Sequence, residues 1–295
     1  MALSVARSPL RALLVWVLWT LCFPAGLHAA TRAEIVVPDQ LCLPGEAVFV
    51  EAFLQRSGLL GRIMPGIQGE LLEWFDADGQ RLASLLTDAS GHARFAYRPD
   101  RPGTASFQVR LSDNPRVHAE PASGRVFVRK PGRPLFFVTV EGALRQEEKP
   151  RGPFVARQGT AEPLAGAQQT LTRAQACSTP VYLTALPRTR LDEVRRWLGT
   201  HSFPEAPVLL LESAPDPKQP GSFTLETDLF ASLRDGHPAP AVLVTGNRGL
   251  AALASEEGVD VYLLVDEGPS RDAPEKTPRI RPAAGWEEVP PPCGL

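Results

Sequence analysis

Histidine and cysteine are scarce in this chain, and neither occurs at a metal-binding spacing. The 295 residues include five histidines and four cysteines, without a Cys-x-x-Cys or a His-x-x-x-His pair. Structural zinc sites are commonly built from such closely spaced pairs. The sequence therefore argues against a structural zinc site.

An excess of charge of one sign is also missing. The chain has 31 lysines and arginines against 33 aspartates and glutamates, for a formal net charge of −2. There is no stripe of basic residues of the kind that contacts nucleic-acid phosphates, so we expect no nucleic-acid partner. Glycine-rich nucleotide loops are absent, and Ser222, Asp235 and His237 lack the Gly-x-Ser-x-Gly elbow of a hydrolase triad.

The chain has no long apolar run, but a short one lies near its beginning. Arg7 and Arg11 precede the apolar run Ala12–Phe23, and the small residues Ala29–Ala30 follow. This order is typical of a secretory signal peptide. The run is shorter than the ~20 residues that span a bilayer, and an uncleaved anchor is the alternative. We expect removal of residues 1–30 and a periplasmic or secreted protein.

Three cysteines remain after such a cleavage, namely Cys42, Cys177 and Cys293. An oxidising compartment would allow one disulfide bond. Three thiols permit three pairings, and the sequence does not choose between them.

Residues 34–130 alternate between apolar and polar with a period near two, and turn sequences recur along them. Asp76–Gly79 and Asp88–Gly91 are turns in which glycine supplies a positive φ. The glycine-rich segment Ser57–Gly69 is expected to be a mobile loop. Short strands without a helical period predict an immunoglobulin-like β-sandwich over residues 31–130, and Thr87–Pro99 resembles bacterial immunoglobulin-like modules. The expected strands cover residues 47–54, 70–75, 82–87, 93–97, 104–111 and 125–128.

The pattern changes after Pro131–Pro134, which we take as a linker because proline and glycine interrupt regular structure. Strands then alternate with helical segments, which predicts a parallel sheet covered by helices over residues 131–267. The expected helices cover residues 168–177, 189–201, 224–234 and 248–257. The remaining residues 268–295 are rich in proline and charge and are expected to form a disordered tail.

A six-residue motif follows the apolar run Leu135–Val138, which is typical of a buried strand. The sequence Thr-Val-Glu-Gly-Ala-Leu, starting at Thr139, resembles the first motif of the haloacid-dehalogenase (HAD) phosphohydrolases, Asp-x-Asp-Gly-Thr-Leu. In that family the first aspartate attacks phosphorus and the second protonates the leaving group. Thr139 and Glu141 stand at these two places here.

Two further segments carry the same resemblance. Pro180–Pro187 is similar to the second motif, in which a strand delivers a hydroxyl to the phosphoryl group, here Thr184. Gly246–Arg248 follows the strand-like Ala241–Val244 and resembles the Gly-Asn-Arg-x-x-Asp segment of lipin-type and Nir-type HAD domains. The resemblance covers roughly residues 134–266 and implies a HAD-like Rossmannoid α/β fold.

The resemblance also implies that catalytic parts are missing. Thr139 cannot form the covalent phosphoaspartate that the family uses. Ala251 stands where the family has a metal-ligand aspartate, and Lys218 is the nearest cation to the position of the family's lysine. Thr184 keeps the family's hydroxyl. These replacements predict an inactive domain that needs no metal or other cofactor.

We therefore expect an exported pseudophosphatase that binds a phosphorylated ligand, an anionic lipid head group or a protein partner, the last through the immunoglobulin-like domain. One alternative is an active Mg²⁺-dependent phosphatase that uses Glu141 and Asp266 for the metal. Another is a structural envelope protein. Ligands of open α/β sheets bind at the carboxyl ends of the strands. The predicted ligand-binding residues are Thr139, Glu141, Thr184, Asn247 and Arg248.

Overall fold

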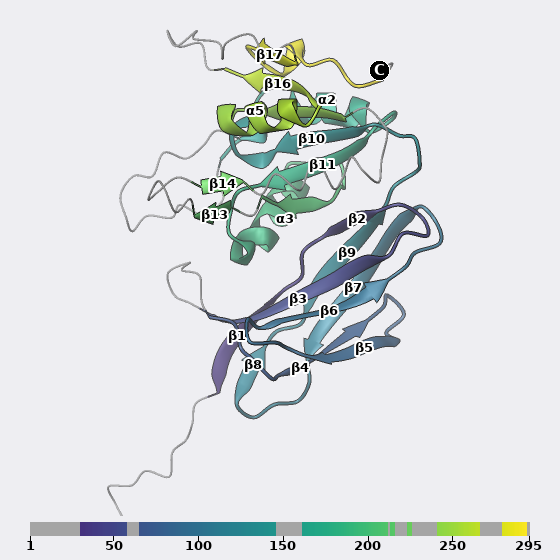
Figure 1. Ribbon diagram of the computed structural model, residues 1–295, viewed down its shortest axis with the longest axis vertical. Helices are drawn as coiled ribbons and strands as arrows, with labels where there is room; N and C mark the ends of the chain where they lie inside the picture. The colour runs from purple at the N-terminus through teal and green to yellow at the C-terminus, as the bar shows by residue number, and fades with distance from the viewer. Residues whose placement is uncertain are drawn as a thin grey trace, which may run out of the picture.

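A computed structural model describes residues 30–57, 65–145, 161–211, 213–215, 223–225, 241–265 and 279–293. Within these ranges the chain forms an N-terminal β-sandwich, at the bottom of Figure 1, and a C-terminal α/β domain above it. No helix in this part of the chain is long and apolar enough to cross a membrane. The expected signal peptide lies outside the described residues, apart from Ala30.

Two β-sheets pack face to face in the N-terminal domain. The first, in the order β6-β3-β1-β8, contains β1 (Thr31–Val36), β3 (Val48–Arg56), β6 (His92–Tyr97) and β8 (Val117–Ala119). The second, in the order β2-β9-β7-β4-β5, contains β2 (Gln40–Cys42), β4 (Leu71–Phe75), β5 (Arg81–Leu86), β7 (Gly103–Leu111) and β9 (Ala122–Val128). Apart from the hairpin of β4 and β5, successive strands change sheet as in an immunoglobulin-like sandwich, and this part of the prediction is confirmed.

The core of the sandwich is filled by alternate residues from both sheets. Val50 and Leu54 of β3 and Trp74 and Val109 of the opposite sheet belong to one buried cluster. The Trp74 ring is fully buried and meets Phe95 edge-on, with ring centroids 5.7 Å apart. A buried tryptophan in the core is also a hallmark of immunoglobulin domains.

The six expected strands are all present, each with ends within three residues of those predicted, whereas β1, β2 and β8 were not predicted. Residues 65–69 of the expected loop at Ser57–Gly69 form no strand, as predicted, but they pack against the sandwich. The amide of Ile67 donates to Leu54 O at 2.9 Å, so this part of the segment is bonded to β3. Gly66 allows this packing, because a Cβ there would overlap the backbone of Ser90. Residues 58–64 lie outside the described ranges.

A six-stranded parallel sheet forms the centre of the C-terminal domain, in the order β12-β11-β10-β15-β16-β17. Its strands are β10 (Leu135–Thr139), β11 (Thr179–Thr184), β12 (Val208–Leu210), β15 (Ala241–Thr245), β16 (Asp260–Leu264) and β17 (Ile280–Ala283). The helices are α2 (Ala167–Ala174), α3 (Leu191–Thr200) and α5 (Arg248–Glu256), with the short turns η1 (Val140–Leu144), η2 (Arg188–Arg190) and η3 (Trp286–Glu288). The strand order reverses between β10 and β15, as in doubly wound α/β proteins.

The parallel sheet and three of the four expected helices are thus confirmed. The helix expected at residues 224–234 is wrong at its beginning. Residues Phe223–Leu225 form the strand β14, which pairs antiparallel with β13 (Ser213–Pro215). Residues 226–234 lie outside the described part of the chain.

Strand β10 is buried along its whole length because both faces of the sheet are covered. Phe136 and Val138 point to the face that packs against α2 and α3, in one cluster with Leu171 and Trp197. Residues 135 and 137 point to the other face and pack with Leu250 of α5. A continuous apolar run is typical of such a strand.

The C-terminal segment 279–293 is part of the α/β fold. Strand β17 extends the parallel sheet, and Trp286 is 1% exposed in the cluster that contains β10. A disulfide bond joins Cys293 to Cys177 after α2. The expectation of a disordered tail is therefore wrong for residues 279–293. The proline-rich and charged composition of this segment suggested disorder. It did not show that Trp286 is buried by residues that lie far away in the sequence.

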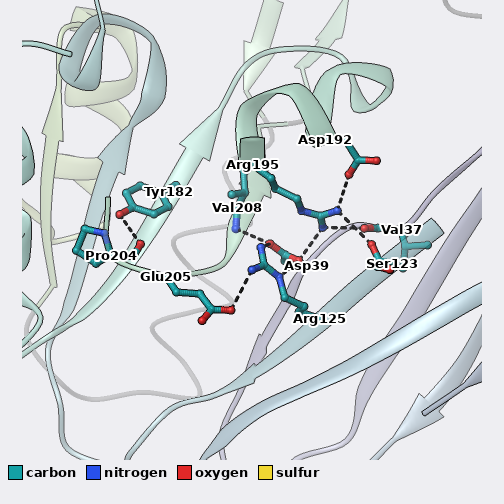
Figure 2. A network of polar contacts seen from close by, with 10 residues as sticks. All are labelled: Val37, Asp39, Ser123, Arg125, Tyr182, Asp192, Arg195, Pro204, Glu205 and Val208. Atoms are coloured by element: carbon teal, nitrogen blue, oxygen red, sulfur yellow. Dashed lines mark hydrogen bonds and ion pairs between the residues drawn. The ribbon is translucent and has the colours of Figure 1, made fainter. Parts of the chain in front are cut away.

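The two domains meet at a buried carboxylate (Figure 2). Asp39 lies between β1 and β2, and its side chain is 0% exposed. It accepts hydrogen bonds from Arg125 of β9 at 3.1 Å, from Arg195 of α3 at 2.6 Å and from the Val208 amide of β12 at 3.0 Å. Arg195 also donates to the carbonyl oxygen of Val37 at 2.8 Å. One sandwich carboxylate therefore binds two elements of the α/β domain.

Apolar contacts accompany this network. Val36 of the sandwich belongs to the buried cluster on the α2 and α3 side of the parallel sheet. Leu41 packs against the cluster on the α5 side. The predicted linker at Pro131–Pro134 lies between the last strand of the sandwich, β9, and the first strand of the parallel sheet, β10. It gives no sign that the domains share buried residues.

Candidate functional site

Three adjacent strands of the parallel sheet each end in a buried threonine. Thr184 ends β11, Thr139 ends β10 and Thr245 ends β15. Their exposures are 0%, 4% and 0%, respectively. The hydroxyl of Thr139 donates to that of Thr245 at 3.2 Å. Because the strands are parallel, the three hydroxyls lie at the edge where ligands of this architecture bind.

The chain leaves β10 through the tight turn η1. Glu141 has φ −80° and ψ 128°, and Gly142 has φ 81° and ψ −15°. These angles are those of a type II turn, whose third residue needs a positive φ and is therefore usually glycine. The amide of Arg145 donates to Val140 O at 3.1 Å and closes the wider loop around this turn. Gly142 thus supplies the conformation that places Glu141 beside β11.

The carboxylate of Glu141 is held by three donors. The Thr184 hydroxyl lies 3.1 Å from Oε2 and 3.2 Å from Oε1. The amide of Ala185 donates to Oε2 at 3.1 Å, and the Arg145 guanidinium donates to Oε1 at 3.1 Å. We call the Thr184 hydroxyl, the Ala185 amide and the Arg145 guanidinium the oxyanion cradle. Hydroxyl, amide and guanidinium groups are the donors that stabilise oxyanions in proteins.

The direction of the Thr184 hydroxyl is fixed by the backbone. The amide of Leu186 donates to Thr184 Oγ1 at 3.2 Å. The oxygen therefore accepts one bond, and its proton is available to Glu141.

Arg145 is held on its other side by α3. Its side chain is 9% exposed, and its guanidinium carbon lies 5.4 Å from the ring centre of the buried Trp197. A desolvated guanidinium over an aromatic face is a favourable arrangement. Nearby, the pKa of the Glu193 carboxyl is lowered, chiefly by its hydrogen bond with Arg190 and also by the charges of Arg145 and Arg196. This side of the cradle is therefore rich in guanidinium groups.

The turns after β10 and β15 touch through two glycines. A Cβ at Gly246 would lie 2.6 Å from Gly142 O, and one at Gly142 would lie 3.3 Å from the Cα of Gly246. The indole of Trp286 donates to Ala143 O at 2.6 Å and holds the first turn from the C-terminal segment. Backbone contacts therefore fill the strand-order reversal point, and the cradle lies on the β11 side of it.

No family model matches this chain, and no curated protein matches it. Solved structures give partial similarities. A CARDB domain from Pyrococcus furiosus is 14% identical and covers 33% of this chain and 86% of that chain, with a TM-score of 0.24. The D00-D0 domain of intimin is 15% identical and covers 32% and 46%, with a TM-score of 0.25. The IG27 protein domain is 14% identical and covers 36% and 100%, with a TM-score of 0.24.

The five predicted ligand-binding residues all lie at the carboxyl edge of the sheet, but they do not form one cluster. Glu141 and Thr184 bond to each other, whereas Thr139 bonds to the hydroxyl that ends β15. The side-chain oxygen of Asn247 accepts the Leu250 amide at 3.0 Å and caps α5. Arg248 begins α5 and is exposed. Thr139 and Asn247 therefore have structural partners, and Glu141 and Thr184 form the polar centre.

Sequence reasoning missed two members of the cradle. Arg145 lies four residues after Glu141 in the sequence, and the tight turn brings the two side chains together as an ion pair. The spacing of the two charges is the signal that could have identified Arg145. The Ala185 amide has no sequence signal, because a backbone donor is independent of the side chain. Lys218 and Asp266, named above for the family's lysine and for a metal, lie outside the described ranges. So do Ser222, Asp235 and His237.

Within the described part of the chain, no group of three histidine, cysteine, aspartate or glutamate side chains is placed to hold a metal ion. A cavity of about 520 Å³ lies between the sandwich and α3. Glu34 lines this cavity, and its pKa is raised chiefly by burial and also by the charge of Asp192. No cradle residue lines this cavity. The residues that line it are Glu34, Thr189, Asp192, Glu193, Arg196, Trp197, Thr200 and His201.

Proposed function

We propose that this chain is an exported, catalytically inactive HAD-like protein that binds a phosphomonoester at the carboxyl edge of its parallel sheet. The convergence of Thr184, the Ala185 amide and Arg145 on one carboxylate carries the proposal. A phosphomonoester presents oxygens of the same kind with more negative charge. The same donors therefore suit it, and the guanidinium binds it more strongly than a neutral donor would.

Three features support a HAD-like origin of the α/β domain. The sheet is parallel and doubly wound, as the resemblance implies. Gly142 lies in the turn directly after the first strand, and Thr184 lies at the end of the second. Both positions match those of the family motifs.

The surroundings of Thr139 and Glu141 support binding without phosphoryl transfer. Thr139 offers a hydroxyl where the family has a carboxylate, and this hydroxyl is bonded to that of Thr245. Glu141, at the place of the acid, is ion-paired with Arg145. A covalent phosphoenzyme needs an activated nucleophile, and neither residue supplies one.

The disulfide bond between Cys177 and Cys293 supports export. Disulfide bonds persist in the periplasm and outside the cell, and they are rare in the cytosol. The predicted signal peptide leads to the same compartment. Purification from the native source should therefore return a chain that begins near Thr31.

Titration of the ¹⁵N-labelled protein with phenyl phosphate tests the proposed site. The Ala185 amide signal should shift in a saturable manner in the wild type, and Thr184→Val should weaken the response at least about tenfold. The control is Thr172→Val on α2, whose hydroxyl donates only to the backbone oxygen of Gln168 among the described contacts. The proposal would be overturned if the chemical shift of the Ala185 amide stayed unchanged at saturating phenyl phosphate, both in the wild type and in the Glu141 variants described below.

A second arm distinguishes a soluble ligand from a lipid head group. Flotation is compared between vesicles of phosphatidylcholine alone and vesicles that also contain phosphatidate. Phosphatidate-dependent flotation that Thr184→Val weakens identifies the head group as the source. A response to phenyl phosphate without flotation identifies a soluble phosphomonoester. Both results support the shared chemistry, and failure of both arms contradicts it.

A further inference from the structure

We infer that Glu141 is an internal competitor for the ligand, so that a phosphomonoester enters the cradle only when this carboxylate leaves. The inference rests on the proposed function, because it concerns the same donors. It adds a regulatory step to that function. The site is closed by the chain's own anion, and the ligand must displace it.

The first argument is the number of protons available. The Thr184 hydroxyl has one proton, and it is directed at Glu141 because Oγ1 already accepts from Leu186. The Ala185 amide also has one proton, and Glu141 accepts it. An outside oxygen therefore cannot bond to either donor while the Glu141 carboxylate remains.

The second argument comes from burial. Thr184 is 0% exposed, although it ends a strand at the edge of the sheet. The Glu141 side chain is 18% exposed, which makes it the outer member of the pair. When the carboxylate leaves, it uncovers the hydroxyl from the solvent side. It also removes the carboxylate that is hydrogen-bonded to the buried guanidinium of Arg145, and loss of this counter-charge favours binding of another anion there.

The third argument concerns what has to move. The backbone of the turn is fixed by the Arg145 amide bond to Val140 and by the Trp286 indole bond to Ala143. Gly142 also packs against Gly246. The Glu141 side chain, in contrast, turns about its own single bonds. Opening of the cradle therefore requires a side-chain rotation and leaves the fold in place.

Glu141→Ala and Glu141→Gln test the inference with phenyl phosphate as the probe. Glu141→Ala removes the competitor and should bind phenyl phosphate at least about tenfold more tightly than the wild type. Glu141→Gln keeps an amide oxygen that still accepts from Thr184 and Ala185, so its gain should be smaller. Glu256→Ala is the matched control, because Glu256 is exposed at the opposite end of α5 from the turn. It should bind as the wild type does.

Acetate provides a second measurement. It supplies the carboxylate that Glu141→Ala lacks, so it should raise the melting temperature of this variant and leave that of the wild type unchanged. Acetate should also compete with phenyl phosphate in the variant. The double variant Glu141→Ala with Thr184→Val should lose most of the gain, because the uncovered hydroxyl is then absent.

The possible outcomes separate the inference from the proposed function. Equal binding by the wild type and Glu141→Ala would keep the proposed function and overturn the internal competitor. No binding by either folded protein would overturn both. The wild type also allows a direct test that needs no variant, through the ¹³C signal of the Glu141 carboxyl carbon. Saturating phenyl phosphate should shift this signal as the contact with Thr184 breaks, and a ligand-bound wild type that keeps the contact would contradict the inference.

Discussion

The carboxylate of Asp39 and the guanidinium of Arg195 meet at 2.6 Å across the boundary between the sandwich and the α/β domain (Figure 2). The Asp39 side chain is 0% exposed and the Arg195 side chain is 14% exposed, so water screens this pair little. Removal of one partner from a buried ion pair leaves the other charge without compensation, at a cost of about 3–5 kcal/mol. We therefore expect the interface to couple the folding of the two domains.

Asp39→Ala should lower the free energy of unfolding by about 3–5 kcal/mol, because Arg195 loses its buried counter-charge and the Val208 amide loses its acceptor. Asp192→Ala is the control. Asp192 lies 2.9 Å from the same guanidinium, but its side chain is 66% exposed, so its loss should cost at most about 1 kcal/mol. Urea unfolding monitored by circular dichroism measures both. Two separate transitions in the wild type would show that the domains are independent.

Gly246→Ala should destabilise the protein by about 1–3 kcal/mol. The added Cβ would lie 2.6 Å from Gly142 O, and both atoms belong to backbone turns that cannot easily yield. Gly199→Ala in α3 is the control, and it should change the stability of the protein in the opposite direction. A Cβ there meets nothing within 4 Å, and alanine favours a helix over glycine by up to about 1 kcal/mol. Thermal melts of the two variants give the comparison, and equal melting temperatures would refute the close contact of the turns.

The Cys177–Cys293 disulfide should contribute about 2–4 kcal/mol to stability, because it joins residues 116 positions apart and ties down the segment that carries Trp286. Cys293→Ser should lower the free energy of unfolding by this amount. Peptide mapping without reductant should recover Cys177 linked to Cys293. A link of either residue to Cys42 would contradict the pairing.

Cys42 should resist alkylation in the native protein. Its thiol is buried in the sandwich, and its pKa is raised to about 11, chiefly by burial and also by the charge of Glu46. The reactive thiolate is therefore rare at pH 8, and iodoacetamide should label Cys42 far more slowly in buffer than in denaturant.

The raised pKa of Cys42 means that this thiol ionises at a lower pH in the unfolded chain than in the folded protein. The contribution of this thiol to stability is therefore fully present below about pH 9 and falls as the pH rises towards 11. Cys42→Ala should lack this loss.

Short patterns in the sequence correctly predicted those strands and helices that are determined by residues close together in the chain. The alternation along β3 and β6, the glycine turns between strands and the apolar run of β10 all appear in short windows of sequence. Gly142 is a similar case, because a type II turn needs glycine at that position. Thr184 was correctly placed at the carboxyl end of its strand.

Contacts between distant segments were not predictable in this way. Asp39 was not singled out, because its bonds reach Arg195 and Val208, more than 150 positions away. Trp286 lies in a proline-rich segment, and its burial depends on distant partners, namely the apolar cluster around β10 and the carbonyl of Ala143. The ion pair that neutralises Glu141 depends on the conformation of the turn, which the spacing of residues alone does not specify.

The remaining prediction concerns phosphoryl transfer. The purified protein should release no phosphate from phosphatidate or aryl phosphates in a Mg²⁺-dependent reaction, measured by a colorimetric phosphate assay. Thr139→Asp should not restore activity. The new carboxylate would occupy a site that is 4% exposed, and the fully buried Ala251, which the resemblance places at a metal-ligand position, has no side-chain oxygen to offer. Arg145 would still hold Glu141, which under the proposed HAD-like origin stands at the position of the acid.

The assay also decides between inactivity and the rearranged phosphatase. Wild-type turnover that Glu141→Gln abolishes would make Glu141 a working acid, since the amide cannot donate a proton from a carboxyl group. Turnover that survives both Glu141→Gln and Thr184→Val would point to a contaminating enzyme, because the cradle would then take no part. If Glu141 closes a binding site that has no activity, the assays should give a third result. Turnover is absent in every variant, and the affinity for phenyl phosphate rises when Glu141 is removed.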